Sequence, residues 1–171
     1  MQRSNTISSL PRLCLALFAA LLVAAPVALA AEAGETETAR PEYVAKVDPI
    51  CNRNARANTR ILKGVKRQVQ RGGLAPAGRR FIRASLVFGK TTAQIAAIPR
   101  PASDSARLTR WIGYLKREKT YLWKIGRLLK ARKKNPAYRQ AVQLKKNNSR
   151  ANAAIVGFGF RHCAIDQSKF L

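Results

Sequence analysis

Apolar residues recur every three or four positions through most of the chain after residue 42, which is the spacing of amphipathic α-helices. Glycine and proline clusters at residues 72–76, 99–101 and 135–136 divide this pattern into four segments. We predict helices over residues 48–71, 76–98, 103–132 and 136–157, with Asp48 and either Ser103 or Asp104 as N-caps. Four such helices predict an all-α fold over residues 43–171. The short connections between them favour antiparallel neighbours, and therefore a four-helix up-down-up-down bundle.

The first 42 residues have a different pattern. Arg3 and Arg12 precede an unbroken apolar run over residues 13–25, and small residues follow at positions 28 and 30. This layout predicts a signal peptide over residues 1–30, so that the protein is secreted or associated with the cell envelope. The alternative, an uncleaved membrane anchor, is disfavoured because the run is shorter than the roughly 20 residues of a membrane span. The acidic segment 31–42 is expected to be a disordered leader.

Cleavage of the signal peptide would leave two of the three cysteines, Cys51 and Cys163. An even number of cysteines outside the cytoplasm favours a disulfide, although two free thiols are the alternative. The up-down-up-down topology places the start of the first helix beside the end of the fourth. The two cysteines can then meet, and the bundle is predicted to be closed by one disulfide.

Two short stretches resemble a known group of proteins. The sequences ICNRN at residues 50–54 and GFGFRHC at residues 157–163 are similar to those of small exported helical proteins of high-GC bacteria. The resemblance implies an exported helical protein with paired terminal cysteines. It implies no activity, cofactor or substrate.

Positive charge dominates the composition. The net charge is +25, and residues 43–171 contain 30 Lys and Arg against four Asp and Glu. Folding does not require this excess, since self-repulsion opposes a compact state. We therefore expect an anionic partner: a wall polymer, lipid headgroups of a membrane surface or extracellular nucleic acid.

The basic residues are arranged in two rows at helical spacing. The first row comprises Arg53, Arg56, Arg60, Lys63, Arg67 and Arg71. The second comprises Lys116, Lys119, Arg127 and Lys130, with Trp123 among them. Both rows lie opposite the apolar positions of their helices, which predicts exposed, anion-binding faces. The alternative is an ordinary solvated surface, but such surfaces mix both signs of charge.

Residues for catalysis or metal binding are few. His162 is the one histidine, and its neighbour Cys163 is needed for the disulfide. Too few carboxylates, histidines and free cysteines remain for a metal site, and no phosphate-binding loop or nucleophile elbow is present. We therefore expect neither an enzyme nor a bound metal or cofactor.

Glu118 is the exception among the charged residues, because it falls within the apolar arc of its predicted helix. A buried carboxylate needs partners, and the asparagines that share inward positions are Asn54, Asn58, Asn148 and Asn152. We expect a buried polar network in which Glu118 bonds to Asn148 or Asn152. The alternative is a general acid or a small polar ligand site in the bundle core.

These observations leave three hypotheses for function. The leading one is a non-enzymatic protein that binds an anionic polymer or surface by multivalent charge pairing. The second is a structural or protein-interaction module of the envelope. The third is a small-ligand carrier or enzyme built around Glu118, which a pocket at that residue would favour.

Overall fold

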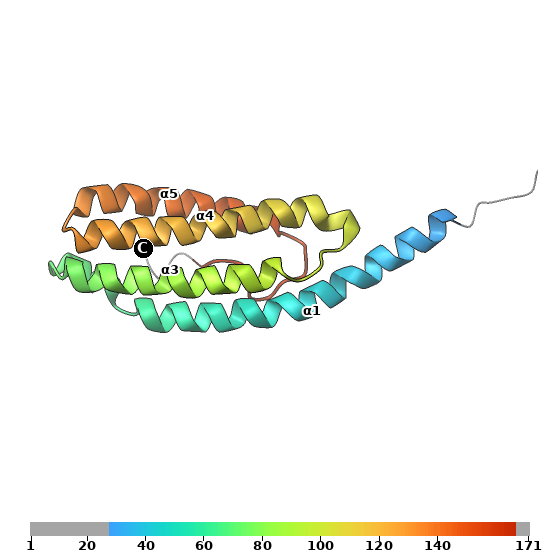
Figure 1. Ribbon diagram of the computed structural model, residues 1–171, viewed down its shortest axis with the longest axis horizontal. Helices are drawn as coiled ribbons and strands as arrows, with labels where there is room; N and C mark the ends of the chain where they lie inside the picture. Colours follow the sequence, from blue (N-terminus) through green and yellow to red (C-terminus); the bar gives the residue numbers. More distant parts are fainter. Residues whose placement is uncertain (1–27, 167–171) are drawn as a thin grey trace, which may run out of the picture.

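The computed structural model describes residues 28–166, with side chains from residue 39 onward, and this part of the chain is all-helical. The predicted signal peptide, residues 1–30, lies almost wholly outside it. The elements are α1 (Ala28–Leu62), α2 (Val65–Gln70), α3 (Leu74–Ala96), a 3₁₀ turn η1 (Ala102–Asp104), α4 (Ser105–Lys130) and α5 (Lys134–Ala154). Figure 1 shows the four long helices lying side by side, with α1 extending beyond the others.

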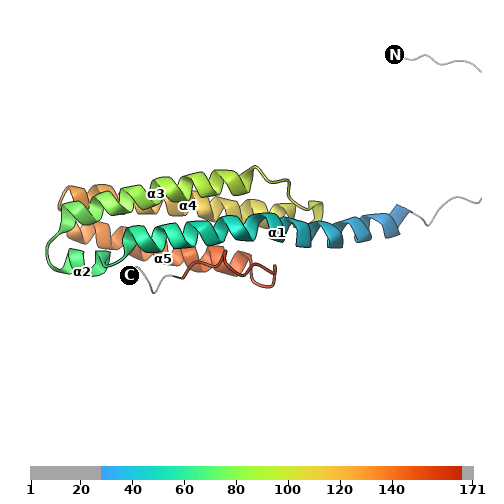
Figure 2. The ribbon, with the colours of Figure 1, turned by 90° about the horizontal axis from the view of Figure 1, so that it is seen from below.

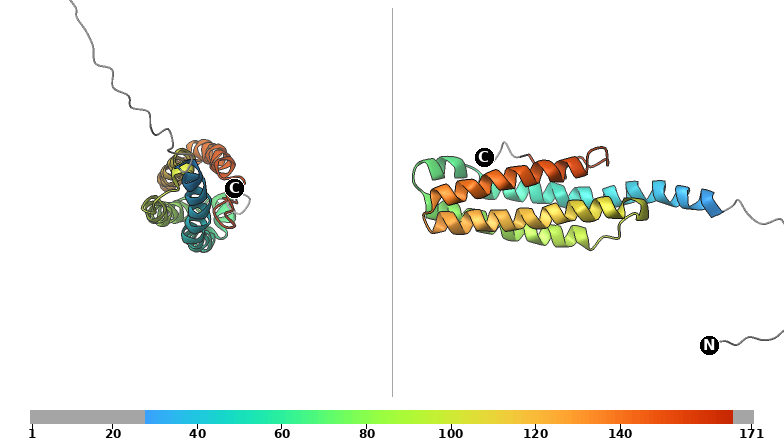
Figure 3. Two further views of the ribbon diagram at one scale, coloured as in Figure 1. Left: turned by 90° about the vertical axis from the view of Figure 1, so that its right-hand side faces the viewer. Right: turned by 90° about the horizontal axis from the view of Figure 1, so that it is seen from above.

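The helices pack in the order α1, α3, α4, α5, whereas α1 and α5 make little direct contact. Viewed end-on, they surround a common centre (Figure 3). Trp111, Leu108 and Val47 are among the fully buried side chains there. The predicted 3.6-residue periodicity is thus confirmed as the pattern that forms the core.

The first helix differs from its prediction at its start. It begins at Ala28 and passes through Pro41 and Pro49, so the assignment of Asp48 as its N-cap is wrong. The segment 31–42, expected to be a disordered leader, is helical. Packing explains the part of the helix that precedes Asp48 from residue 43: Tyr43, Val47 and Cys51 repeat every four residues and are all buried, so a continuous helix keeps them on one face. Pro49 removes one backbone hydrogen bond from this helix, and the burial of these three side chains offsets that loss.

The first helix also ends earlier than predicted. It stops at Leu62, and Gly64 adopts a left-handed conformation with φ of 74° before α2 begins. Glycine adopts this conformation without steric penalty, so the chain turns here. Arg80 of α3 closes the end of α1 by donating to the carbonyl oxygens of Ile61 and Lys63, at 2.6 and 2.7 Å.

A pair of glycines sets the spacing of α3 and α4. A Cβ atom on Gly78 would lie 2.6 Å from the carbonyl oxygen of Gly126, and one on Gly126 would lie 2.8 Å from that of Gly78. The two backbones therefore touch at this crossing, and no larger side chain fits between them. The pattern of apolar residues did not predict this contact.

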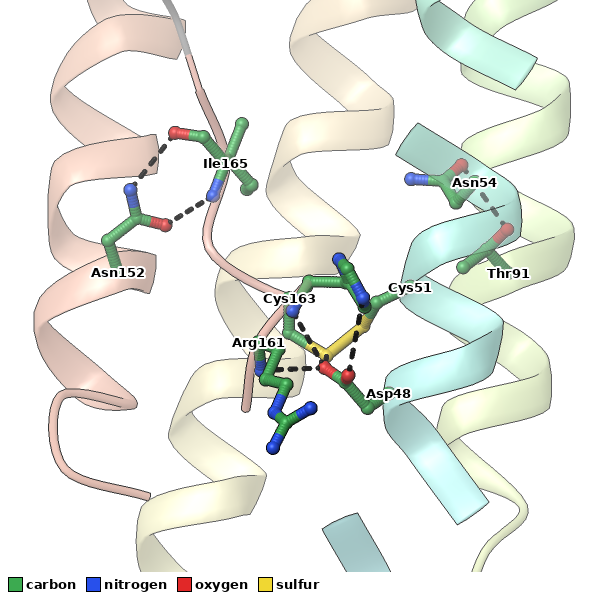
Figure 4. Close-up of a disulfide and its surroundings, with 9 residues drawn as sticks. Asp48, Cys51, Asn54, Thr91, Asn152, Arg161, Cys163 and Ile165 are labelled. Carbon is green, nitrogen blue, oxygen red and sulfur yellow. Dashed lines mark hydrogen bonds and ion pairs between the residues drawn. A yellow bond between two sulfur atoms is a disulfide. The ribbon is translucent and has the colours of Figure 1, made fainter. Parts of the chain in front are cut away.

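The chain after α5 returns along the bundle between α5 and α1. Cys163 forms a disulfide with Cys51 of α1, with the sulfur atoms 2.10 Å apart. Asp48 accepts the backbone N–H groups of Arg161 and His162 on Oδ1, at 2.9 and 2.8 Å. Figure 4 shows Asp48 reaching from α1 to this returning segment. The carboxylate predicted to cap a helix instead binds the C-terminal segment.

Candidate functional site

The basic residues predicted to bind anions are all exposed, but the first row is not continuous. Arg53, Arg56 and Arg60 lie on α1. The other three cations, Lys63, Arg67 and Arg71, lie beyond the end of that helix. The left-handed turn at Gly64 separates α1 from the short helix α2 and so interrupts the row. The prediction of six cations on one helical face is therefore wrong. Sequence spacing alone could not reveal the left-handed glycine that interrupts the row.

The second row lies on one uninterrupted helix. Lys116, Lys119, Arg127 and Lys130 are exposed on α4, and Trp123 is 45% exposed among them. The guanidinium carbon of Arg127 lies 5.5 Å from the centre of the Trp123 ring. This distance permits a cation–π interaction, which holds the flat indole and the planar guanidinium together at the surface. The two rows lie on helices that pack against α3 rather than against each other.

The acidic residues have a very different placement from the basic ones. Among residues 39–166, every Lys and Arg except Arg80 and Arg107 is exposed, whereas only Glu42 and Asp166 among the acids are. Asp104 is buried and pairs with Arg40, whose Nε and Nη2 donate at 2.7 and 2.9 Å. The carboxylates are thus mostly used inside the fold, and the described surface is left with almost unbroken positive charge.

Glu118 lies in the core on α4 and is only 5% exposed. Burial raises the pKa of its carboxyl group to about 8, because the charged form loses its solvation. The side-chain amide of Asn148 faces this carboxyl group. Its oxygen and nitrogen are assigned by the hydrogen bonds that each can form. In that orientation, Nδ2 of Asn148 donates to Oε2 of Glu118 and to the carbonyl oxygen of Leu144, both at 3.2 Å. The structure therefore brings Glu118 and Asn148 together across α4 and α5.

The other predicted asparagines have different partners. Asn152 bonds the backbone of Ile165 through both amide atoms, at 3.0 and 2.8 Å, and so holds the C-terminal segment rather than Glu118. Asn54 accepts hydrogen bonds from Asn58 and from Thr91 of α3, at 3.0 and 3.3 Å. Figure 4 shows the Asn54–Thr91 and Asn152–Ile165 pairs on either side of the disulfide.

Asn147 is a further buried asparagine, which was not predicted from the sequence. Asn147 donates to the carbonyl oxygen of Tyr114 at 3.0 Å and accepts from Arg117 at 3.4 Å. Consecutive asparagines at positions 147 and 148 contact the same neighbouring helix. The pattern on α5 gave no signal for this, since two adjacent helical residues point about 100° apart and only one of them was assigned to the core.

A cavity of about 250 Å³ lies beside Glu118, between α1, α3, α4 and the C-terminal segment. Its wall includes Asn58, Trp111 and Thr91, together with His162 and the disulfide. Oδ1 of Asn58 and Nε1 of Trp111 are buried there without a hydrogen-bond partner. Buried polar atoms normally form hydrogen bonds. These two atoms form none within the described residues, so they remain able to bond a molecule in the cavity.

The C-terminal segment that covers this cavity is anchored at several points. Phe160 stacks on Trp111 and Phe158, with ring centres 5.4 and 4.9 Å apart. Arg107 binds the end of α5 by donating to the carbonyl oxygens of Ala154 and Val156. Together with the disulfide, these contacts make the segment a fixed part of the bundle.

Comparison with protein-family models, with curated proteins and with solved structures finds no match to this chain. Within residues 28–166, no helix has the length and apolar character needed to cross a membrane. The same residues contain no group of three or more histidine, cysteine or acidic side chains placed to hold a metal ion.

Proposed function

We propose that this protein is an exported, non-enzymatic basic protein that binds an anionic polymer or surface in the cell envelope or outside the cell. The observation that carries this proposal is the separation of charge. Among residues 39–166 the cations are nearly all exposed, while Asp104 and Glu118 are buried. Such a surface has few carboxylates to cancel its positive potential, and it attracts polyanions. Export rests on the signal predicted at residues 1–30.

Binding would be multivalent. One exposed ion pair contributes about 0.2–1 kcal/mol, so affinity has to come from many contacts formed together and from release of the polymer's counterions. The uninterrupted row on α4 places four cations on one rigid helix, where they can contact the polymer together. The guanidinium of Arg127 can donate two parallel hydrogen bonds to an anionic group, and the indole of Trp123 offers a flat surface for stacking.

We propose in addition that the four long helices alternate in direction as an up-down-up-down bundle. The short connections between α3, α4 and α5 support this topology. So do the directions of the chain in Figures 1 and 2, where the colours run along neighbouring helices in opposite senses. A rigid bundle of this kind keeps the basic row on α4 at a fixed spacing.

The test replaces the row on α4 and compares it with an equal change elsewhere. A variant with Lys116, Lys119, Arg127 and Lys130 changed to Gln loses four exposed charges. A matched control loses four charges at Arg139, Lys146 and Arg150 of α5 and at Lys90 of α3, all of them exposed. Binding to long-chain polyphosphate is measured by titration at fixed salt.

We expect the α4 variant to lose at least about fourfold in affinity, because four contacts of about 0.2–1 kcal/mol each sum to about 0.8–4 kcal/mol. The control should lose clearly less. Equal losses would mean that the row has no special role and that only total charge matters. Unchanged affinity in both variants would refute the proposal.

One observation favours a second candidate, a small-ligand carrier. The cavity beside Glu118 has polar groups that the fold leaves without partners. A thermal-shift screen of small polar molecules against the parent and a Glu118→Gln variant tests it. A stabilising ligand that loses its effect in the variant would support this second function, and no stabilisation by any compound would exclude it for the molecules screened.

A further inference from the structure

The cavity beside Glu118 lies between two helices that make little contact with each other. Both α1 and α4 pack on α3. The remaining side is closed by the C-terminal segment, which binds Asp48 of α1 and Asn152 of α5. Figure 2 shows this segment running back along α1 and α5. The cavity of about 250 Å³ therefore has α1 on one wall and α4 on another.

The wall formed by α1 contains a chain of side-chain hydrogen bonds with one open end. Nδ2 of Asn58 donates to Oδ1 of Asn54 at 3.0 Å, and the hydroxyl of Thr91 from α3 donates to the same oxygen at 3.3 Å. Oδ1 of Asn58 ends this chain. Asn58 is buried, and this atom has no partner within the described residues. A buried carbonyl oxygen of this kind needs a hydrogen-bond donor.

The wall formed by α4 presents the opposite kind of group. Trp111 is fully buried, and its Nε1–H has no acceptor in the described part of the chain. An indole N–H can only donate, so its partner has to be an acceptor. Phe88, Ile95 and Leu115 supply apolar surface between the polar groups. One acceptor on α1 and one donor on α4 are thus left unpaired in a single cavity.

The charges around the cavity favour a neutral occupant. Burial raises the pKa of Glu118 to about 8, so this carboxyl group is neutral at pH 7 and offers no counter-charge to a cation. The free oxygen of Asn58 would repel an anion. The other titratable side chains of the lining, Arg161, His162 and Asp166, are exposed on the C-terminal segment, where water screens their charges. A buried charge without a partner is costly, so a neutral molecule fits best.

We propose that this cavity binds a small neutral amide, whose N–H donates to Oδ1 of Asn58 and whose carbonyl oxygen accepts from Nε1 of Trp111. The N–H and C=O of a planar amide point to opposite sides, so that one group can bond both helices. A cavity of about 150 Å³ can hold benzene, so this cavity has room for an amide with one ring. The inference rests on the second candidate function above, the small-ligand carrier, and does not depend on polymer binding.

The probe is benzamide, titrated into the disulfide-bonded protein at pH 7 and followed by ¹H–¹⁵N correlation NMR. The chain has two tryptophans, so the spectrum contains two indole N–H signals. Benzamide should shift the signal of Trp111, because the new acceptor changes the environment of its proton. The signal of Trp123, which lies on the surface of α4, should stay in place. A Trp111→Phe variant assigns the two signals by removing one of them.

Four molecules of nearly the same size as benzamide test which of its groups matter. Acetophenone keeps the carbonyl but has no N–H, so it should bind about tenfold more weakly, as Oδ1 of Asn58 stays unpaired. Benzoate and benzylammonium carry a charge and should bind at least tenfold more weakly. Benzyl alcohol, which donates and accepts through one oxygen, should also bind more weakly. All affinities are taken from the backbone amide signals of Phe88 and Leu115, which line the cavity.

Variants assign each contact to its wall. Asn58→Ala should remove the difference between benzamide and acetophenone, whereas Trp111→Phe should weaken both ligands by the same factor. A second pair leaves these side chains in place. Ala55 is exposed and lines the cavity, so Ala55→Trp should obstruct it and weaken benzamide binding at least tenfold. Ala153 is equally exposed on α5 outside the lining, so Ala153→Trp should have no effect.

The outcomes separate this inference from the function on which it rests. Tighter binding of benzoate, benzylammonium or benzyl alcohol than of benzamide would overturn the amide and leave a carrier for another class of ligand. Equal affinity for acetophenone and benzamide, or benzamide binding that survives Ala55→Trp, would also overturn the inference. If no probe bound at millimolar concentration, the cavity would hold water only, and both the inference and a carrier for ligands of this size would be wrong.

Discussion

Replacing Glu118 with glutamine should make the stability of the protein less dependent on pH. In the folded state burial raises the pKa of this carboxyl group from 4.5 to about 8, whereas the unfolded chain keeps the ordinary value. Between these two pH values the folded protein binds a proton that the unfolded chain has released. The contribution of protonated Glu118 to the free energy of unfolding is therefore fully present below about pH 4.5, and it is lost as the pH rises toward 8.

The size of the effect follows from linkage. One proton bound only by the folded state changes the free energy of unfolding by roughly 1.4 kcal/mol per pH unit. Glutamine is neutral at every pH and has nearly the same shape as the protonated acid. The variant and the parent should thus differ by less than about 1 kcal/mol at pH 4, and the variant should be more stable by a few kcal/mol at pH 8.

Urea unfolding followed by circular dichroism from pH 4 to pH 9 measures this difference. The two proteins differ only at position 118, so every other contribution to the pH dependence cancels in the comparison. A Glu118→Ala variant serves as a second control: it removes the partner of Asn148 and should cost about 1–3 kcal/mol at pH 4. Parallel pH profiles for the parent and Glu118→Gln would show that Glu118 is not a buried acid with a raised pKa.

Three further predictions concern the packing and the C-terminal segment. Gly78→Ala should destabilise the protein by about 1–3 kcal/mol in urea unfolding, since its Cβ would meet the α4 backbone. Gly113→Ala, where a Cβ meets nothing within 4 Å, should instead stabilise it by about 0.5–1 kcal/mol; equal effects would contradict the glycine contact. Reducing the Cys51–Cys163 bond, which joins residues 112 apart, should lower stability by about 4–5 kcal/mol, and an unchanged thermal midpoint would count against this closure. Asn152→Ala should speed proteolytic cleavage near Ile165, with the bundle left intact; unaltered cleavage would show that this pair does not hold the segment.

The sequence predicted the helices well where hydrophobic periodicity decides the structure. The all-helical fold and the cysteine pair are confirmed, and Glu118 lies in the core where its helical phase placed it. Helix ends were harder, because local signals compete with packing. Asp48 followed by Pro49 is typical of a helix start, yet burial of Tyr43 and Val47 carries the helix through both residues.

The candidate sites were less predictable because they depend on contacts between distant segments. The glycine at position 64 lies within a strongly helical pattern, and nothing local shows that its φ is positive. The choice between Asn148 and Asn152 depends on where residues 157–166 return, since that segment binds Asn152.

Binding of a repeating anion by the exposed cations is tested by the salt dependence of binding to long-chain polyphosphate. Affinity is measured between 50 mM and 500 mM salt, and its logarithm is plotted against the logarithm of salt concentration. We expect a straight line that falls steeply, with a slope of several units, because each contact releases bound counterions. Binding that is absent at low salt, or that stays nearly constant across the range, would contradict it.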